Sequence, residues 1–169
     1  MKAFQRSLPL LFGLGLILTQ GRQVSHAQGP PERPRAFYLT QTTHSGGEAR
    51  SACAAGYHMA SLWEIFDTSN LRYDTRLGLT QGDSGSGPPT FVYGWIRTGN
   101  IASTGLEGPG AANCSAWTSD SGMDSGTVVL LEPDWSAGGT EASPVSPISP
   151  WAAAAGGCVT ARNVWCVQN

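Results

Sequence analysis

Four cysteines constrain the fold of this chain more than any other feature of its sequence. Cys53, Cys114, Cys158 and Cys166 are widely and unequally spaced, and all follow an N-terminal segment typical of export. An even number of cysteines in an exported chain predicts disulfides, here two of them. A structural zinc site is the rival use of four cysteines, but it expects knuckles of the CxxC type, which do not occur here. We therefore expect two disulfides, no metal and no cofactor.

Residues 1–27 have the pattern of a secretory signal peptide. Lys2 and Arg6 precede the apolar run 8–18, and Ser25 and Ala27 place small residues where a signal peptidase reads. A run of about a dozen apolar residues is too short to span a bilayer. We expect cleavage near Ala27 and a secreted, periplasmic or cell-surface protein.

The charge balance excludes two classes of partner. Without residues 1–27 the chain keeps seven arginines, no lysine and twelve acids, a net charge of 7 − 12 = −5. Nucleic-acid binding requires clustered cations that displace counterions from phosphates, and electrostatic binding to anionic lipid requires a polybasic segment. We expect neither nucleic acid nor a membrane as partner.

The remaining chain divides into an arm and one domain. Residues 28–35 read QGPPERPR, a proline-rich segment that favours an extended arm. Residues 36–169 are long enough to bury one core, because a chain of about 140 residues removes roughly two thirds of its unfolded surface from water.

Two capping-box patterns predict two short helices early in the domain. Ser45 with Glu48 predicts a first helix that carries Cys53 on its core-facing side and ends at Gly56. Ser61 with Glu64 predicts a second helix through residue 66. Its apolar residues available for burial are Leu62, Ile65 and Phe66.

The strands are predicted from runs of β-branched and aromatic residues. We expect strands at 37–40, 91–96 and 127–131, the last of them central, and a strand pair or hairpin at 158–167. Long loops are expected at 79–90, 98–112 and 132–157. This pattern predicts an α+β fold, with two short helices packed on a small, mostly antiparallel sheet.

The motifs associated with catalysis are incomplete. The segment 82–88, GDSGSGP, resembles the nucleophile loop of chymotrypsin-type serine proteases. That mechanism needs a histidine base and an aspartate held by two barrels, whereas His44 and His58 both lie within forty residues of Ser84. We interpret the segment as a Gly/Ser loop and expect no enzyme activity.

Two further patterns have ordinary interpretations. Asp120 and Asp124 have the spacing of a calcium-loop fragment, but the full series of ligands does not follow, so we expect a solvated turn. Asn113 begins a glycosylation pattern with a cysteine at its middle position.

Ligand binding is predicted for part of the long loop 132–157. Glu132 and Asp134 supply carboxylates, and Trp135 and Trp151 lie in a Pro/Ala/Gly-rich context where they could be exposed anchors. An aromatic surface beside carboxylates suits stacking on a sugar. It equally suits a loop held down by its own tryptophans.

The ordered motifs resemble those of the C-type lectin-like domain. The segment 56–62, GYHMASL, is similar to the exit of that family's first helix, and 93–96, YGWI, to its buried Trp-Ile strand. The end of the chain, 158–166, CVTARNVWC, is similar to the family's final cysteine pair. The resemblance covers residues 36–169 and is closest to short secreted bacterial C-type lectin-like and endostatin-like domains.

The resemblance implies the pairing of the cysteines and a departure from the family. It implies bridges from Cys53 to Cys166 and from Cys114 to Cys158, one of three pairings that four cysteines allow. The family's calcium ligands do not appear in register, because Glu132 follows the second cysteine and Trp151 precedes four alanines. The resemblance thus implies the family fold without its calcium site.

Two functions remain open at this point. The first is a secreted or surface-exposed module that binds a glycan or an extracellular protein through its long loops. The second is a structural subunit of an extracellular assembly, with self-association through the loop residues Trp135 and Trp151.

Overall fold

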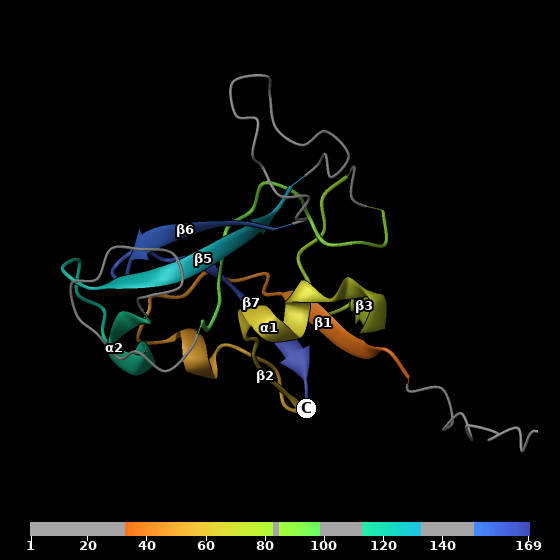
Figure 1. Cartoon of the computed structure of the whole chain (residues 1–169), viewed down its shortest axis with the longest axis horizontal. Coiled ribbons are helices and arrows are strands. Elements are labelled where there is room, and N and C mark those ends of the chain that lie inside the picture. Colours follow the sequence, from red (N-terminus) through yellow and green to blue (C-terminus); the bar gives the residue numbers. More distant parts are fainter. Residues whose placement is uncertain (1–32, 83–84, 99–112, 133–150) are drawn as a thin grey trace, which may run out of the picture. The chain divides into compact units, whose positions relative to one another are not determined.

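The computed structural model describes residues 33–82, 85–98, 113–132 and 151–169. The fold is α+β, as predicted, with a mixed sheet, two short helices and two disulfides (Figure 1). The strands are β1 (Arg35–Leu39), β2 (Tyr57–Met59), β3 (Leu71–Tyr73), β4 (Gly94–Trp95), β5 (Ser125–Leu131), β6 (Trp151–Gly157) and β7 (Asn163–Gln168). The helices are α1 (Leu62–Phe66) and α2 (Cys114–Trp117), and η1 (Ala49–Ser51) and η2 (Thr68–Asn70) are single 3-10 turns.

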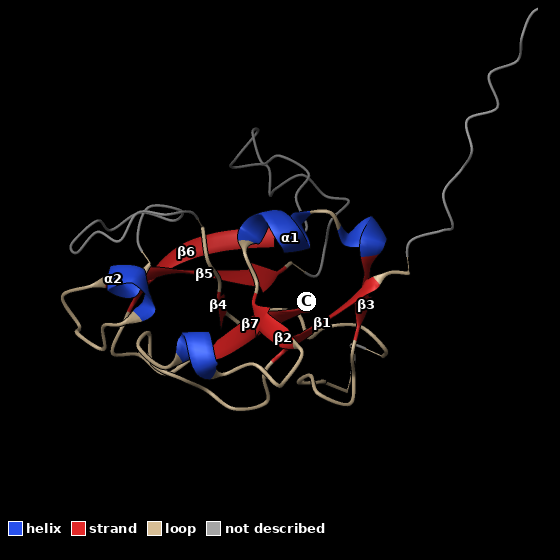
Figure 2. Ribbon diagram, turned by 90° about the horizontal axis from the view of Figure 1, so that it is seen from below, coloured by secondary structure: helices blue, strands red, loops and turns tan. Residues whose placement is uncertain are grey.

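The strands run in the order β3-β1-β7-β4-β5-β6, with β2 also paired to β7. The pairs β1–β3 and β4–β7 are parallel and the other pairs are antiparallel. β7, the last strand in the chain, lies at the centre because it pairs with β1, β2 and β4. The N-terminal and C-terminal strands of the described domain are therefore hydrogen-bonded neighbours (Figure 2).

The prediction of an irregular segment over 132–157 is wrong for its last seven residues. Trp151–Gly157 forms β6, which pairs with the whole of β5 in unbroken register from Leu131↔Trp151 to Ser125↔Gly157. Figure 1 shows the two strands side by side. The predicted strand pair or hairpin at 158–167 is also wrong, because this segment contains only β7, which pairs with β1, β2 and β4, whereas β6 pairs with β5.

The core forms around two buried tryptophans of neighbouring strands. Trp165 donates its indole N–H to the Val129 carbonyl oxygen at 3.1 Å and stacks on Phe37. Trp95 donates its indole N–H to the His44 carbonyl oxygen at 2.8 Å, and its ring contacts that of Trp117 edge to face. Both indole nitrogens thus have partners, which burial of a tryptophan requires.

The first predicted helix is reduced to the 3-10 turn η1. Its hydrogen bonds join residues three apart, and the Ser45 side chain bonds to the Asp120 carboxylate instead of capping the helix. Glu48 completes half of the predicted box, since its carboxylate accepts the Ser45 amide at 3.2 Å. Gly56 has a φ of +83°, the left-handed conformation predicted for the end of this helix.

Two other predicted boundaries differ from the structure. The strand expected at 91–96 contains only Gly94 and Trp95, because Phe91 has a φ of 60° and lies 65% exposed. A positive φ breaks an extended backbone. The sheet also begins at Arg35, the last residue of the predicted arm, while residues 28–32 lie outside the described residues.

The two disulfides join Cys53 to Cys166 and Cys114 to Cys158. This is the pairing that the resemblance implies. The first ties the segment after η1 to β7, and the second ties α2 to the turn after β6. Disulfides of this kind are typical of an extracellular or otherwise oxidising compartment. Within the described ranges, no helix is long and apolar enough to cross a membrane.

Candidate functional site

The structure does not support the predicted role of Trp151 as an exposed anchor. Trp151 is only 7% exposed, and its indole N–H donates to the Ile65 carbonyl oxygen at 3.0 Å. Its ring meets Trp165 edge to face at 5.1 Å. Trp151 therefore fastens the start of β6 to α1. The buried position of Trp151 was not predicted, because the alanine run after this tryptophan resembles a loop. In the structure, pairing of β6 with β5 turns the side chain of Trp151 toward the core.

The other predicted ligand-binding residues fall around the end of β5. Glu132 directly follows β5 and is partly buried. Asp134 and Trp135 lie outside the described residues. The structure thus brings no set of these residues together within the ranges that it describes.

A different group of exposed aromatic and charged side chains lies on and around α1. Ile65 is fully buried and Leu62 packs against the core, while Trp63 and Phe66 of this five-residue helix face water. Trp63 is 78% exposed and Phe66 is 57% exposed. Residues three apart on a helix are neighbours on its surface. The two rings thus share one exposed face, and the prediction that Phe66 is available for burial is wrong.

The Glu64 carboxylate lies at the centre of the charges next to these rings. Its Oε2 accepts the Ser61 amide at 2.9 Å and the Ser61 hydroxyl at 2.8 Å, which completes the capping box that the sequence predicts. Its Oε1 lies 2.9 Å from His58 Nε2 and 3.4 Å from the Arg35 guanidinium. Arg97 lies 3.7 Å from Oε2. One carboxylate is therefore surrounded by two arginines and a histidine.

The acidity of Glu64 follows from these contacts. Partial burial by itself raises the pKa of Glu64, but hydrogen bonds from Ser61 and from His58 outweigh it and lower the pKa to about 2. The carboxylate is consequently ionised at any physiological pH. It acts as the fixed anion that orients the cations around it.

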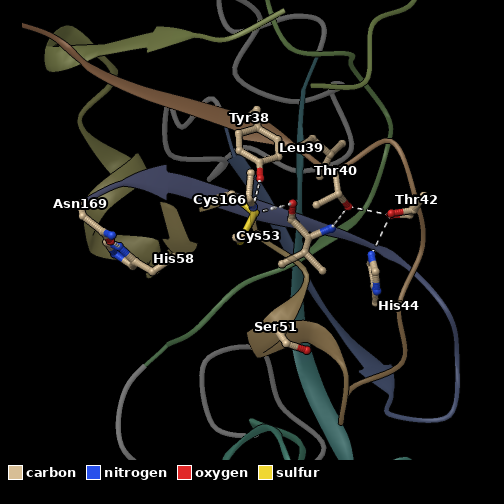
Figure 3. Close-up of a disulfide and its surroundings, with 12 residues drawn as sticks. Tyr38, Leu39, Thr40, Thr42, His44, Ser51, Cys53, His58, Cys166 and Asn169 are labelled. Atoms are coloured by element: carbon tan, nitrogen blue, oxygen red, sulfur yellow. Dashed lines mark hydrogen bonds between the residues drawn. A yellow bond between two sulfur atoms is a disulfide. The ribbon is translucent and has the colours of Figure 1, made fainter. Parts of the chain in front are cut away.

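His58 and Arg97 differ in how fully their own polar atoms are used. His58 Nδ1 lies 2.6 Å from Asn169 Oδ1, so both ring nitrogens of His58 have partners (Figure 3). Arg97 Nε is buried with no hydrogen-bond partner in the described part of the chain, and the side chain of Arg97 is 42% exposed. The buried Nε is out of reach of a ligand, but the exposed part of the Arg97 guanidinium can donate to an anionic or carbonyl group. We call Arg35, His58, Trp63, Glu64, Phe66 and Arg97 together the α1 site.

A shallow cleft of about 250 Å³ lies beside the Cys53–Cys166 disulfide (Figure 3). Its walls carry hydroxyl, amide and small apolar groups: Tyr38, Thr40, Gln41, Thr42, Ala52, Cys53, Ala54 and Leu77. The Tyr38 hydroxyl accepts the Ala54 amide at 2.7 Å, and burial raises the pKa of Tyr38. The cleft is smaller than the usual ligand pocket of roughly 300–1,000 Å³, and its hydroxyls bond within the protein. It is a weaker candidate than the α1 site.

The carboxylates predicted for a turn at 120–124 have structural roles. Asp120 accepts the Gly47 amide at 2.7 Å, and its hydrogen bonds with Ser45 and Gly47 lower its pKa. Asp124 is buried, contrary to the prediction of a solvated turn. Across the described ranges, no three histidine, cysteine, aspartate or glutamate side chains cluster to hold a metal ion.

Two other sequence motifs are placed only in part. Residues 83–84, the Asp-Ser pair of the protease-like GDSGSGP segment, lie outside the described residues. Asn113 is buried and its side-chain oxygen accepts the Thr98 amide at 3.1 Å, so this side chain is not accessible to a glycan in the folded protein.

No model of a known protein family, no curated protein and no solved structure matches this chain.

The aromatic residues of the α1 site could have been found from the sequence. Once Ser61 is the N-cap, Leu62 and Ile65 are three apart and define the inward face, which leaves Trp63 on the outward side. The two arginines of the site could not have been found from the sequence, because Arg35 and Arg97 reach Glu64 from distant parts of the chain.

Proposed function

We propose that this chain is a secreted or cell-surface binding module of C-type lectin-like architecture. It recognises an extracellular protein or glycan through the α1 site, without calcium. Three features of the fold support this architecture: the paired terminal strands β1 and β7, the bridge from Cys53 to Cys166, and a second bridge from Cys114 to Cys158. The signal-peptide pattern of residues 1–27 and the disulfides support export.

The observation that carries the proposal is the exposure of Trp63 and Phe66 on one helix face. Tryptophan is among the side chains most often responsible for binding energy at interfaces, because it offers a large rigid surface at low cost in conformational entropy. Five of the six tryptophans are described, and the other four of these are buried. Trp63 is thus the exception, and folding alone does not account for its position.

The surrounding charges favour a polar ligand over a purely apolar one. The two positive charges of Arg35 and Arg97 exceed the single negative charge of Glu64. The α1 site therefore has a net charge of at least +1, whereas the chain has a net charge of −2. An aromatic platform beside guanidinium donors suits the ring face of a sugar with acidic groups, or a peptide with an acidic side chain. The exposed helix face suits an extended ligand, which can lie across both rings and reach the guanidinium groups beside them.

The test compares ligand binding by the wild type and by Trp63→Ala. Fluorescently labelled protein is applied to an array of sulfated, uronate-containing and neutral glycans and to an array of extracellular proteins, each in EDTA. We expect binding to at least one immobilised ligand and a loss of tenfold or more in Trp63→Ala, since truncation of a tryptophan at the centre of an interface typically has an effect of this size.

Met123→Ala is the matched control for this experiment. Met123 is 84% exposed and precedes β5, whereas α1 contacts the other end of the β5–β6 pair through Trp151. We expect this variant to bind as the wild type does. Binding that both variants retain, or binding that EDTA abolishes in the wild type, would contradict the proposal.

The alternative role as a structural subunit is favoured by a separate observation, the outer edge of β6, which no other strand of the described ranges pairs with. That edge shares no residue with the α1 site.

A further inference from the structure

Among the described residues the sheet ends on β6, because no other strand pairs with the outer edge of this strand. β6 contains seven residues and pairs only with β5. The opposite edge of the sheet is β3, which contains only three residues. A long edge strand offers a row of amide and carbonyl groups to another strand, and short edge strands offer little.

The register identifies the residues whose backbone groups face outward. The Cys158 amide donates to the Asp124 carbonyl at 2.9 Å, and the Ile96 amide donates to the Thr127 carbonyl at 3.1 Å. Hydrogen-bonded and non-hydrogen-bonded pairs alternate along an antiparallel ladder. Residues 152, 154 and 156 therefore bond to β5, while Ala153 and Ala155 direct their amides and carbonyls away from the sheet.

The sequence and register of β6 lack the charges, prolines and bulges by which many edge strands are protected. Its sequence WAAAAGG contains no charged residue and no proline, and the unbroken register with β5 contains no bulge. Lysine, proline and bulges are the usual means of preventing edge-to-edge pairing. The side chains of Ala153 and Ala155 are exposed and too small to obstruct an approaching strand.

We propose that β6 is an interface with a second copy of this chain. The two β6 strands lie antiparallel about a two-fold axis at Ala154, so that Ala153 pairs with Ala155 of the second copy. This arrangement joins the two sheets into one continuous sheet. The outward amides and carbonyls of Ala153 and Ala155 in each copy then have hydrogen-bond partners in the other copy. An identical strand is the fitting partner because a two-fold interface must be self-complementary, and an uncharged alanine run meets its own copy without repulsion or clash.

The interface is expected to be reversible. Pairing of two seven-residue edge strands with small side chains buries much less than the roughly 1,600 Å² of a standard interface. We therefore expect a dissociation constant in the range of about 10 µM to 1 mM.

Sedimentation velocity of the disulfide-intact protein over about 5 µM to 2 mM tests the proposal. The wild type should pass from monomer to dimer across this range. Ala155→Pro should remain monomeric throughout, because proline removes an outward amide and adds a ring on the open edge, while every bond to β5 is kept. Ala153→Lys should also remain monomeric, which separates an edge effect from an effect of proline on folding.

Val159→Lys is the matched control for charge. Val159 is 61% exposed and lies two residues beyond the end of β6, so the same charge is added off the edge. This variant should dimerise like the wild type. A wild type that is monomeric at every concentration, or an Ala153→Lys variant that dimerises as well as the wild type, would overturn the proposal.

Single cysteines test the register. In the proposed dimer Ala154 faces Ala154 of the second copy in a non-hydrogen-bonded pair, where Cβ atoms lie about 4.5–5.5 Å apart. Ala154→Cys should therefore form a disulfide-linked dimer under mild oxidation. Ala152→Cys should not, because Ala152 faces residue 156 of the second copy. The opposite result would overturn the two-fold axis at Ala154. Binding of the Ala153→Lys variant to the glycan and protein arrays tests the α1 site independently of the dimer, because Ala153 is not part of that site.

Discussion

Glu64 connects the start of α1 to three other segments of the chain. Its carboxylate caps the helix through Ser61 and meets Arg35 of β1, His58 of β2 and Arg97 after β4. A capping box needs only one of the carboxylate's hydrogen-bonding directions. The other contacts hold three basic side chains against α1, the helix that carries Trp63, so one residue serves both the local helix and the surface that we propose for binding.

Replacing Glu64 by glutamine should lower stability in a pH-dependent way. The folded-state pKa of Glu64 is about 2, below its ordinary value of 4.5, so its ionised form stabilises the fold above about pH 4.5 and this contribution is lost as the pH falls toward 2. At pH 7 we expect Glu64→Gln to cost about 1 kcal/mol, because these ion pairs are partly exposed. Urea unfolding followed by tryptophan fluorescence at pH 7, 5, 4 and 3 measures the difference.

The difference between the wild type and Glu64→Gln should shrink as the pH falls from 4.5 to 3. Glu48→Gln, at the N-cap of η1, is the control and should cost less at pH 7, since Glu48 accepts only a 3.2 Å hydrogen bond from Ser45 within its half-formed box. A cost for Glu64→Gln that stays constant from pH 7 to pH 3 would show that the charge of Glu64 does not stabilise the fold.

Residue-level features were predictable where the chemistry is local. Ser61 and Glu64 are three apart, so their capping box follows from the sequence, and the left-handed φ of Gly56 follows from its place after a helical turn. Phe66 and Trp151 were assigned the wrong environment. Their burial depends on where α1 and β6 dock, and neither docking position is encoded in the neighbouring residues.

At the level of elements, α2 is unusual because it is left-handed. Cys114, Ser115, Ala116 and Trp117 have φ values of 44°, 51°, 59° and 64°. Left-handed helical backbone costs a non-glycine residue roughly 1–2 kcal/mol. The surroundings hold this turn in place: Cys114 is bridged to Cys158, Trp117 packs on Trp95, and the Trp117 amide donates to the Asn113 carbonyl at 2.7 Å.

Ala116→Gly should stabilise the protein, against the usual direction of such a change. Ala116 is exposed, so the substitution loses no packing, and glycine adopts a φ of 59° without strain. The relief of about 1–2 kcal/mol exceeds the roughly 0.4–1 kcal/mol that a more flexible unfolded chain costs. We expect a net gain of about 0.5–1 kcal/mol in urea unfolding.

Ala161→Gly is the matched control for this prediction. Ala161 is also exposed, but its φ is not in the positive range, so glycine there brings only the entropic cost. It should destabilise the protein. If Ala116→Gly destabilises it to the same extent, the turn at α2 is not left-handed in solution.

The predictability of an element depended on its composition. β5 was predicted because TVVLL is β-branched and apolar, whereas β6 was missed because alanine and glycine have low strand propensity. The partner strand determines β6: seven consecutive pairs with β5 outweigh the local preference of WAAAAGG. The handedness of α2 could not be predicted, because no glycine or asparagine occurs within it.

At the scale of the whole molecule, the disulfides connect parts that the sheet also brings together. Cys53–Cys166 joins residues 113 apart at the central strand β7, and Cys114–Cys158 joins residues 44 apart near the outer strands. The spacing of the cysteines alone leaves three pairings open. The pairing came from the resemblance of residues 36–169 to a family, and the α+β class came from the order of the elements.

Replacing Cys53 and Cys166 together by alanine should cost more stability than replacing Cys114 and Cys158. In the loop-closure model the free-energy contribution grows with the logarithm of loop length, so the first loop, with a sequence separation of 113, exceeds the second, with 44, by about 0.8 kcal/mol. Burial does not add to this difference, because Cys114, Cys158 and Cys166 are all fully buried and Cys53 is only partly buried. Urea unfolding of both double variants at the same pH measures the difference.

Peptide mapping without reduction must accompany this comparison, because the loop lengths follow from which cysteines are paired. The peptide with Cys53 should be joined to that with Cys166, and the peptide with Cys114 to that with Cys158. A bridge between Cys158 and Cys166 would close only a short local loop, and its removal would then cost less than that of either long-range bridge. It would also separate the first turn of the domain from β7 and leave the pairing of β1 with β7 to hydrogen bonds and packing alone. Recovery of that short bridge would therefore overturn both the order of stabilities and the family architecture that we propose.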